Sequence, residues 1–397
     1  MDRPLLNRRL AEFGTTIFAE MSALAVRTDS INLGQGFPDA DGPEEVREAA
    51  VRALRDGRGN QYPPGPGIPE LRTAVAAHQE RFYGHRGLSY DPDTEVLITA
   101  GATEALAASL LALLEPGDEV IALEPYYDSY AACIAMAGAR RVPVTLRPEA
   151  STGTYHLDLD ELRDAVTDDT RLILLNTPHN PTGTVLTHDE LAAIAELAVE
   201  RDLLVITDEV YEHLVFDGEH TPLASFPGMR DRTVTISSAG KTFSFTGWKV
   251  GWVTAAPPLV SAVRSAKQFL TYVSAGPFQY AVAEALALPD SYYTALRDDL
   301  RTKRDILATG LTDAGFQVFR PSGTYFITTD IRPLGAVLSK EGDGFAFCRA
   351  LPERAGVVAI PNAVFYDHKD RGAPYVRFAF CKREEVLREA VGRLRKL

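Results

Sequence analysis

The chain comprises 397 residues, of which 45% are hydrophobic and 24% are charged, and its formal net charge at pH 7 is −13. This length and composition predict a folded, soluble protein whose large hydrophobic core is divided between two domains. The acidic balance argues against nucleic acid or an anionic membrane as the main partner, although a local basic site could still bind an anionic ligand.

Short apolar runs alternate with helical patterns from about residue 95 onwards. The predicted strands are "EVLITAG", "EVIALEP", "RLILLN", "LLVITD" and "TVTISS". Helices are predicted for "TEALAASLLALL" and "THDELAAIAELAVERD". Mostly apolar strands flanked by helices are typical of a parallel sheet buried on both faces. This pattern predicts a large α/β domain over residues 46–290.

The pattern changes near residue 290. A long charged helix, "SYYTALRDDLRTKRDILATGLTDAG", is followed by "TYFITTD" and "YVRFAF", which alternate as half-buried strands do. We therefore predict a smaller α+β domain formed by residues 291–397, completed by residues 1–45.

The cysteines and the N-terminus bear on the cellular compartment. Cys133, Cys348 and Cys381 have no metal-binding spacing, which is typical of free thiols in a reducing compartment. The start "MDRPLLNRRLAEFG" lacks a signal-peptide core, and "ALAASLLALL" is too short to span a bilayer. We expect a cytoplasmic protein with no metal site and no membrane partner.

Several predicted strands end in residues suited to chemistry. Open parallel sheets bind ligands beyond the carboxyl ends of their strands. The residues at or just after these ends are Gly101, Ala102, Thr103, Asn180, Asp208, Tyr211, Ser238 and Lys241. One ligand that would use all of them is pyridoxal 5′-phosphate.

Each residue type has a physical task with this cofactor. The amine of Lys241, among small neighbours, could form a Schiff base with the aldehyde and later move a proton. Asp208 could keep the pyridine nitrogen protonated, and the amides of Ala102 and Thr103 could bind the phosphate at a helix N-terminus. Further candidates are Ser238 and Lys249 for the phosphate, Tyr127 for ring stacking, Asn180 and Tyr211 for the phenolic oxygen, and Arg377 for a substrate carboxylate.

Each feature also has an ordinary structural explanation. Lys241 could be a surface lysine, Asp208 a helix N-cap and Asn180 part of a turn. Arg377 could face solvent, and Lys249 could mark a strand edge. The joint occurrence of these residues, in this order at strand ends, favours a cofactor site.

The motifs resemble those of fold-type I, class I/II pyridoxal-phosphate aminotransferases over nearly the whole chain. The segments that carry the resemblance are "NLGQGFPD", "NQYPPGPG", "GATEAL", "EPYYDSY", "NTPHNPTG", "ITDEVYEHLVFDG", "SSAGKTFSFTGWKVGW" and "YVRFAF". Within this family the chain is similar to the kynurenine/glutamine/methionine aminotransferase branch and to actinobacterial relatives assigned as N-succinyldiaminopimelate aminotransferases. The resemblance implies a mostly parallel seven-stranded sheet in the large domain.

The resemblance also implies individual roles. Lys241 matches the Schiff-base lysine, Asp208 the partner of the pyridinium nitrogen, and Tyr127 the stacking aromatic residue. The other matches are Asn180 and Tyr211 at the phenolate, Gly101, Ala102, Thr103, Ser238 and Lys249 at the phosphate, Gly36 and Arg377 at the substrate carboxylate, Phe18 over the substrate side chain, and Tyr62 with Tyr272 across a homodimer interface. Two positions depart from the pattern, since Lys249 replaces a frequent arginine and Ala102 a hydroxyl residue.

The expected activity is a ping-pong transfer of an amino group between an L-amino acid and a 2-oxo acid. A carbon–sulfur β-lyase and a non-catalytic ligand-binding or regulatory protein are the alternatives. The aromatic candidates favour aromatic or sulfur-containing substrates, whereas N-succinyl-LL-2,6-diaminopimelate would need cationic partners. Lys267 and Arg320 are such cations, but the sequence does not place them in the pocket.

Overall fold

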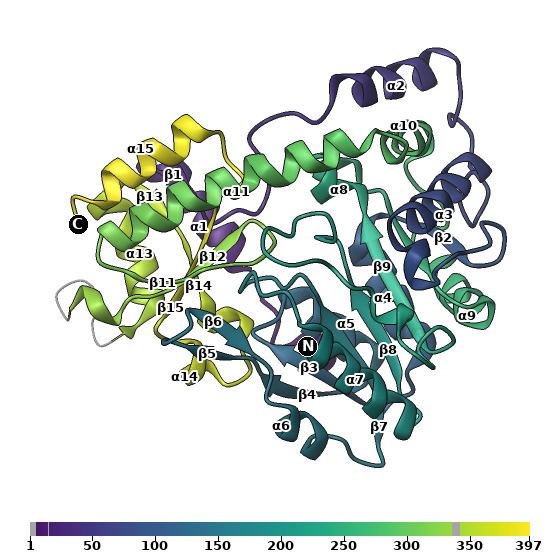
Figure 1. Ribbon diagram of the computed structural model, residues 1–397, viewed down its shortest axis with the longest axis horizontal. Coiled ribbons are helices and arrows are strands. Elements are labelled where there is room, and N and C mark those ends of the chain that lie inside the picture. Colours follow the sequence, from purple (N-terminus) through teal and green to yellow (C-terminus); the bar gives the residue numbers. More distant parts are fainter. Residues whose placement is uncertain (1–4, 15, 336–341) are drawn as a thin grey trace.

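The computed structural model describes residues 5–14, 16–335 and 342–397. Its larger part is built on a seven-stranded sheet with the strand order β2-β10-β9-β8-β7-β3-β4 (Figure 1). All neighbouring strands are parallel except β10, which is antiparallel to both β2 and β9. The strands are β2 (Val96–Thr99), β3 (Glu119–Glu124), β4 (Arg140–Thr145), β7 (Thr170–Asn176), β8 (Leu204–Asp208), β9 (Thr233–Ser238) and β10 (Gly251–Thr254). The predicted mostly parallel sheet of seven strands is confirmed.

Alternate residues of each central strand enter two different cores. In β7, Leu172 and Leu174 pack with helices α4, α5 and α9, whereas Ile173 and Leu175 pack with α6 and α7. Because successive side chains of a strand point to opposite faces, a strand covered on both faces must be apolar throughout. These helices are α4 (Gly101–Leu113), α5 (Asp128–Ala137), α6 (Leu159–Asp164), α7 (His188–Glu200) and α9 (Pro257–Lys267).

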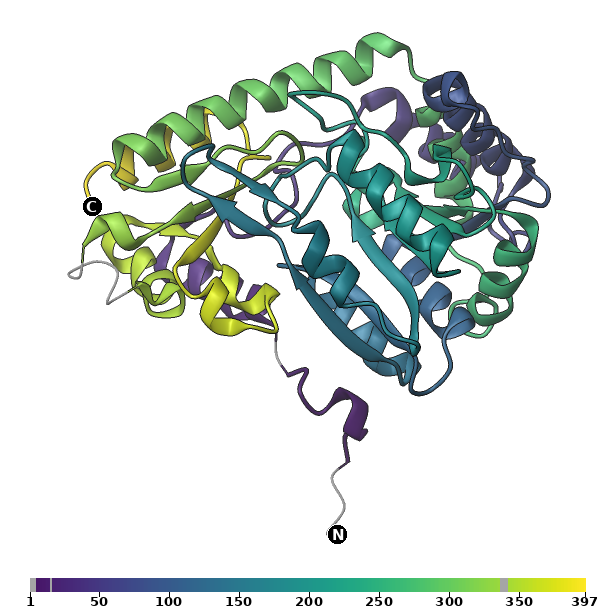
Figure 2. The same cartoon turned by 60° about the horizontal axis from the view of Figure 1, so that its bottom comes forward.

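A third core lies beside β2 and β10 and is formed by three further helices. These are α2 (Glu44–Arg55), α3 (Pro69–Tyr83) and α10 (Gly276–Leu286). From this end, the long helix α11 (Asp290–Asp313) runs across to the smaller part of the molecule (Figures 1 and 2). A short hairpin of β5 (Arg147–Glu149) and β6 (Thr154–His156) and the short helix α8 (Ala239–Thr242) complete the larger part.

The smaller part contains an antiparallel sheet in the order β11-β12-β15-β14. Its strands are β11 (Gln317–Phe319), β12 (Phe326–Asp330), β14 (Ile360–Pro361) and β15 (Tyr375–Ala379), and its helices are α1 (Ile17–Thr28), α13 (Gly344–Ala355), α14 (Lys369–Gly372) and α15 (Glu384–Leu394). Strand β1 (Ile31–Asn32) pairs in parallel with β13 (Val357–Val358), which joins the start of the chain to its end. The predicted boundaries near residues 45 and 290 stay a prediction, and residues 1–4 and 15 of the first segment lie outside the described residues.

The prediction that β12 and β15 are half-buried is wrong, because every residue of both strands is buried. One face packs into the core of the smaller part, through residues such as Ile327 and Phe378. The other face meets the larger part: Thr328 Oγ1 donates to the Pro181 carbonyl at 3.2 Å. The alternation in sequence therefore marks a face that contacts the loop after β7 and not a solvated face. Within the described residues, no helix combines the length and apolar character needed to cross a membrane.

Candidate active site

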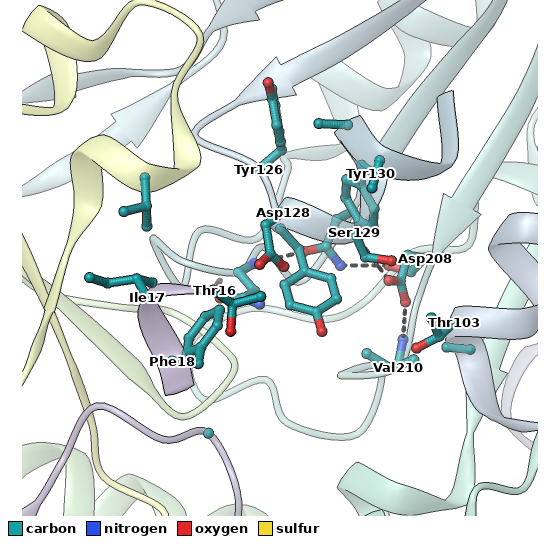
Figure 3. A pocket seen from close by; sticks show the side chains of 18 of the residues that line it. Thr16, Ile17, Phe18, Thr103, Tyr126, Asp128, Ser129, Tyr130, Asp208 and Val210 are labelled. Atoms are coloured by element: carbon teal, nitrogen blue, oxygen red, sulfur yellow. Dashed lines mark hydrogen bonds between the residues drawn. The ribbon is translucent and has the colours of Figure 1, made fainter. Parts of the chain in front are cut away.

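A cavity of about 1110 Å³ lies at the carboxyl ends of β7, β8 and β9 and is closed on its far side by β12 and β15. Figure 3 shows part of its lining, with α1 residues such as Phe18 facing Asp208 across the pocket. The sequence-predicted residues that line it are Phe18, Gly36, Gly101, Ala102, Thr103, Tyr127, Asn180, Asp208, Tyr211, Ser238, Lys241, Lys249 and Arg377. Residues separated by more than 300 positions in sequence thus surround one space.

Lys241 projects into this cavity from α8, the short helix that directly follows β9. Its Nζ donates to the Gly36 carbonyl at 3.3 Å and lies 5.8 Å and 5.5 Å from the ring centroids of Tyr211 and Tyr325. Burial disfavours the charged amine and lowers the pKa of Lys241 to about 8. A substantial fraction of the amine is therefore neutral near physiological pH, which is the nucleophilic form.

Asp208 ends β8 and is buried beside the cavity. Its Oδ2 accepts a hydrogen bond of 2.7 Å from the Tyr130 hydroxyl, and Oδ1 accepts one of 3.4 Å from the Val210 amide. Burial raises the pKa of Asp208, so the ionised carboxylate would gain from a cationic N–H partner. No helix begins after Asp208, since the next residues form turns, and the N-cap explanation is therefore wrong.

Tyr130 was not among the sequence-predicted site residues. It lies three positions after Tyr127 in "EPYYDSY", at the first turn of α5. Residues three apart share a helix face, so the spacing could have indicated that both rings face the same site. In the structure the two rings meet edge to face, with centroids 6.0 Å apart.

The N-terminus of α4 forms a cradle suited to an anion. Gly101 begins this helix with a φ of +73°, and Ala100 at the N-cap provides no side-chain hydrogen bond to the first amides. Lys249 Nζ donates to Thr103 Oγ1 at 3.4 Å, and a Cβ on Gly101 would lie 3.1 Å from that Nζ. Uncapped amides, the helix dipole and an ammonium group together favour a phosphate here, with Ser238 also lining the cavity.

Arg377 on β15 is only 1% exposed, so the solvent-facing alternative is wrong. Its Nη1 donates to Asn180 Oδ1 at 2.8 Å and its Nη2 to the Gly34 carbonyl at 2.9 Å, while the buried Nε has no partner in the structure. The guanidinium carbon lies 5.3 Å from the Phe18 ring centroid. Burial lowers the pKa of Arg377 to about 10, so the group still carries its charge at neutral pH. A buried planar cation of this kind can bind a carboxylate in two-point geometry.

Tyr62 and Tyr272 do not line the cavity of this single chain. Their side chains are 81% and 50% exposed, and their rings contact each other with centroids 5.6 Å apart. Phe269 and Leu270, close in sequence to Tyr272, are also exposed. The prediction that Tyr62 and Tyr272 act across a dimer interface stays a prediction.

The two cations that sequence reasoning considered for substrate binding also lie elsewhere. Lys267 Nζ donates to the carbonyls of Gly65 and Tyr272, and Arg320 pairs with Asp305 at 2.7 Å. The cavity is instead lined on one side by Arg141, Asp367 and Lys369, which the sequence analysis did not select.

A group of potential metal ligands lies outside the cavity, formed by His78, Glu212 and His213. The two imidazoles hydrogen bond to each other, with 2.9 Å between their Nε2 atoms. Glu212 accepts hydrogen bonds of 2.8 Å from Tyr83 and Ser237. Burial lowers the pKa of His78 to about 3, so this ring is neutral. The two imidazoles thus bond to each other, whereas Glu212 is engaged by residues outside the group.

Comparison with known proteins identifies the family. Residues 28–394 match the family "Aminotransferase class I and II". The chain is 54% identical over 395 residues to the probable N-succinyldiaminopimelate aminotransferase DapC of Mycobacterium tuberculosis, covering 97% of each chain. It is 40% identical over 402 residues to the methionine aminotransferase of Escherichia coli, covering 100% of each. The solved N-succinyldiaminopimelate aminotransferase from M. tuberculosis superposes with a TM-score of 0.93 at 55% identity, covering 98% of this chain and 99% of that one. The chain is a fold-type I enzyme that belongs to the class I and II aminotransferases.

Proposed function

We propose that this aminotransferase binds pyridoxal 5′-phosphate in the cavity and moves an amino group between an L-amino acid and a 2-oxo acid in a ping-pong cycle. The observation that carries the proposal is the position of Lys241, whose largely buried amine faces the same cavity as the Asp208 carboxylate and the N-terminus of α4. These three groups suit the aldehyde, the ring nitrogen and the phosphate of one cofactor.

The chemistry of the residues that line the cavity suits this cofactor. When bound, pyridoxal phosphate supplies an aldehyde that takes up the amino group and a ring that withdraws electrons. Asp208, oriented by Tyr130, would accept the N–H of the ring nitrogen and keep it protonated. Ala102, Thr103, Ser238 and Lys249 would hold the phosphate, and Tyr127 would cover the ring. Asn180 and Tyr211 would hydrogen bond to the phenolic oxygen.

The same residues account for the proton movements of an amino transfer. With its pKa lowered to about 8, Lys241 can accept a proton from the substrate α-carbon and return it at another position. Arg377 would bind the substrate α-carboxylate, with Gly36 lining the same end of the cavity. Phe18 lies against Arg377 and would cover the substrate side chain.

Four exposed apolar or aromatic side chains support a homodimer: those of Tyr62, Phe269, Leu270 and Tyr272. Apolar surface of this kind is typical of a region that another protein surface covers. We propose that two protomers meet here about a two-fold axis and that Tyr62 reaches the phosphate of the partner's cofactor. A cytoplasmic location is proposed because the three cysteines are free thiols.

Borohydride reduction tests the cofactor assignment. The purified holoenzyme should absorb visible light, and reduction should fix the cofactor to the peptide that contains Lys241. A Lys241→Ala variant is the matched control and should carry no fixed label. Label on any other lysine, or no chromophore after incubation with pyridoxal phosphate, would contradict the assignment.

Product analysis separates the aminotransferase from a β-lyase. An aminotransferase consumes a 2-oxo acid in proportion to the amino acid used, whereas a β-lyase releases pyruvate and ammonia without an acceptor. The donor panel should include methionine, kynurenine and N-succinyl-LL-2,6-diaminopimelate, because the relatives named for these substrates share 36–54% of their residues with this chain.

A further inference from the structure

The cavity extends to a cationic corner formed by Arg141, Asp367 and Lys369. Arg141 lies on β4, the edge strand of the large sheet, and its guanidinium carbon is 5.8 Å from the ring centroid of Tyr126. Figure 3 shows Tyr126 and Asp208 at different sides of the pocket. Arg141, beside Tyr126, thus lines a part of the cavity that differs from the part at Asp208.

Arg141 is held by a two-point pair with Asp367, and its Nη1 makes no hydrogen bond to any described residue. Its Nε and Nη2 donate to the two carboxylate oxygens of Asp367 at 2.7 Å and 2.6 Å. A guanidinium has five N–H donors, so this pair leaves the edge that contains Nη1 open. Among the described residues, the carboxylate paired with Nη1 is Glu12 at 3.8 Å, which is beyond hydrogen-bond distance, and Glu12 is 60% exposed.

Lys369 places a second cation at the same corner. Within the ranges that the structure describes, its Nζ makes neither a hydrogen bond nor an ion pair, although the side chain lines the cavity. The nearby Asp367 is already engaged by Arg141: burial raises the pKa of that carboxyl, but the hydrogen bonds and charge of Arg141 outweigh burial and hold it below its ordinary value. Lys369 is thus a second cation at this corner, attracted by the charges of Asp367, Glu124 and Glu12.

A purely structural role explains only part of this arrangement. The Arg141–Asp367 pair ties the edge strand to the segment after β14, which accounts for the engaged edge of the guanidinium. It does not account for the open edge of the guanidinium or for a second cation whose Nζ makes no hydrogen bond to any described residue. The cavity of about 1110 Å³ is also at the upper limit of ordinary ligand pockets, so it has room beyond a cofactor and a short amino acid.

We propose that Arg141, oriented by Asp367, and Lys369 bind a second carboxylate, at the far end of the amino donor's side chain. A carboxylate would accept two parallel hydrogen bonds from the open edge of Arg141 and a third from Lys369. The preferred donor is then an amino acid with a long side chain that ends in a carboxylate. This inference rests on the proposed function, in which Arg377 binds the α-carboxylate at the other end.

The chemistry of the corner also separates the candidate donors. N-succinyl-LL-2,6-diaminopimelate carries two carboxylates beyond its reacting carbon, so it belongs to the class that Arg141 and Lys369 would select. Methionine and kynurenine lack a distal carboxylate and would leave both cations without a partner. Methionine and kynurenine would therefore bind without the interactions of Arg141 and Lys369, but they could still react.

Two matched amino donors test the proposal on the holoenzyme. 2-Aminopimelate has a distal carboxylate, and 2-aminooctanoate has a neutral chain of similar length. For Arg141→Met we expect kcat/KM for 2-aminopimelate to fall by about ten- to a hundredfold, the range for loss of a charged hydrogen bond. The value for 2-aminooctanoate should stay within about twofold, since no distal group contacts the changed residue.

Further variants keep the test decisive. Lys369→Met should also lower the ratio of kcat/KM for 2-aminopimelate to kcat/KM for 2-aminooctanoate. This variant decides the question if Arg141→Met fails to fold. Arg163→Met is the control, because Arg163 is 53% exposed on α6 and pairs with the exposed Asp160. N-succinyl-LL-2,6-diaminopimelate as a third donor should respond as 2-aminopimelate does.

An unchanged donor ratio in both variants would overturn the inference. An equal decrease in kcat/KM for the charged and the neutral donor would also overturn it, because such a decrease indicates a structural effect. Both outcomes leave the aminotransferase intact, because wild-type enzyme still converts both donors. Failure of the proposed function has a different signature, in which the wild type converts neither donor and the visible absorbance is unaffected by amino acids.

Discussion

The Tyr130 hydroxyl donates a hydrogen bond of 2.7 Å to Oδ2 of Asp208, and both side chains are buried. Tyr130 lies in the first turn of α5, the helix that follows β3. Asp208 ends β8, which is two strands away from β3 in the sheet. The hydroxyl opposes the rise in the Asp208 pKa that burial causes, so it favours the ionised carboxylate. A carboxylate that must hold a proton on a cofactor nitrogen needs this support.

Replacement of Tyr130 by phenylalanine should therefore weaken catalysis without loss of the fold. The variant loses one hydrogen bond to a buried, ionised carboxylate, worth about 1.5–3 kcal/mol, or roughly ten- to over a hundredfold in the rate of amino transfer. Stopped-flow absorbance of the half-reaction measures this rate. Cofactor content per subunit is the control and should be unchanged. A wild-type rate would mean that Tyr130 does not assist Asp208.

Arg377→Lys should lower kcat/KM for every amino acid and every 2-oxo acid alike. Lysine keeps the charge but cannot form two parallel hydrogen bonds to a carboxylate. Loss of one charged hydrogen bond predicts about 1.5–3 kcal/mol, or roughly ten- to over a hundredfold. Steady-state kinetics with several donors checks this. Amines without a carboxylate should be nearly unaffected, and a selective loss for one donor only would argue against a general carboxylate site.

The cofactor-free enzyme should bind pyridoxal phosphate faster as the pH rises through about 8, because burial lowers the pKa of Lys241 to that value and the neutral amine is the reactive form. The same shift has a consequence for stability. Between the folded-state pKa and the ordinary lysine value, the unfolded chain binds more protons, so the contribution of Lys241 to the free energy of unfolding rises with pH.

Denaturant titrations of the cofactor-free protein test this second effect. The free energy of unfolding of wild type, relative to that of Lys241→Met, should increase between about pH 8 and about pH 10.5. A difference that is constant over this range would show that the amine is not desolvated in the folded chain.

Tyr62 should make the affinity for pyridoxal phosphate depend on formation of the dimer. If two protomers pack through these exposed side chains, sedimentation should give a dimer at assay concentration. The interface between the protomers should be of obligate size. Tyr62→Phe should keep the dimer but raise the concentration of pyridoxal phosphate needed for half-saturation by roughly two- to tenfold, since one hydrogen bond is lost. A monomer with full activity would refute the shared site.

The sequence by itself determined the chemistry-bearing segments and the sheet. Continuous apolar strands such as β7 can be stable only between two helical layers, so a parallel sheet followed from composition and period alone. Because ligands bind at the carboxyl ends of such strands, Asp208 and Lys241 could be selected before any coordinates. These inferences depend on which residues neighbour one another along the chain, and the sequence gives this information directly.

Other features were decided only by the tertiary structure. The alternating pattern of β15 is the same for a solvated face and for one covered by another sheet, and only the packing shows that Arg377 is buried against Asn180. Arg141 and Asp367 are 226 positions apart, and no periodic signal links residues that meet through the packing of an edge strand on a distant segment. Long-range contacts of this kind depend on how whole elements pack, because each side chain taken alone is equally suited to solvent.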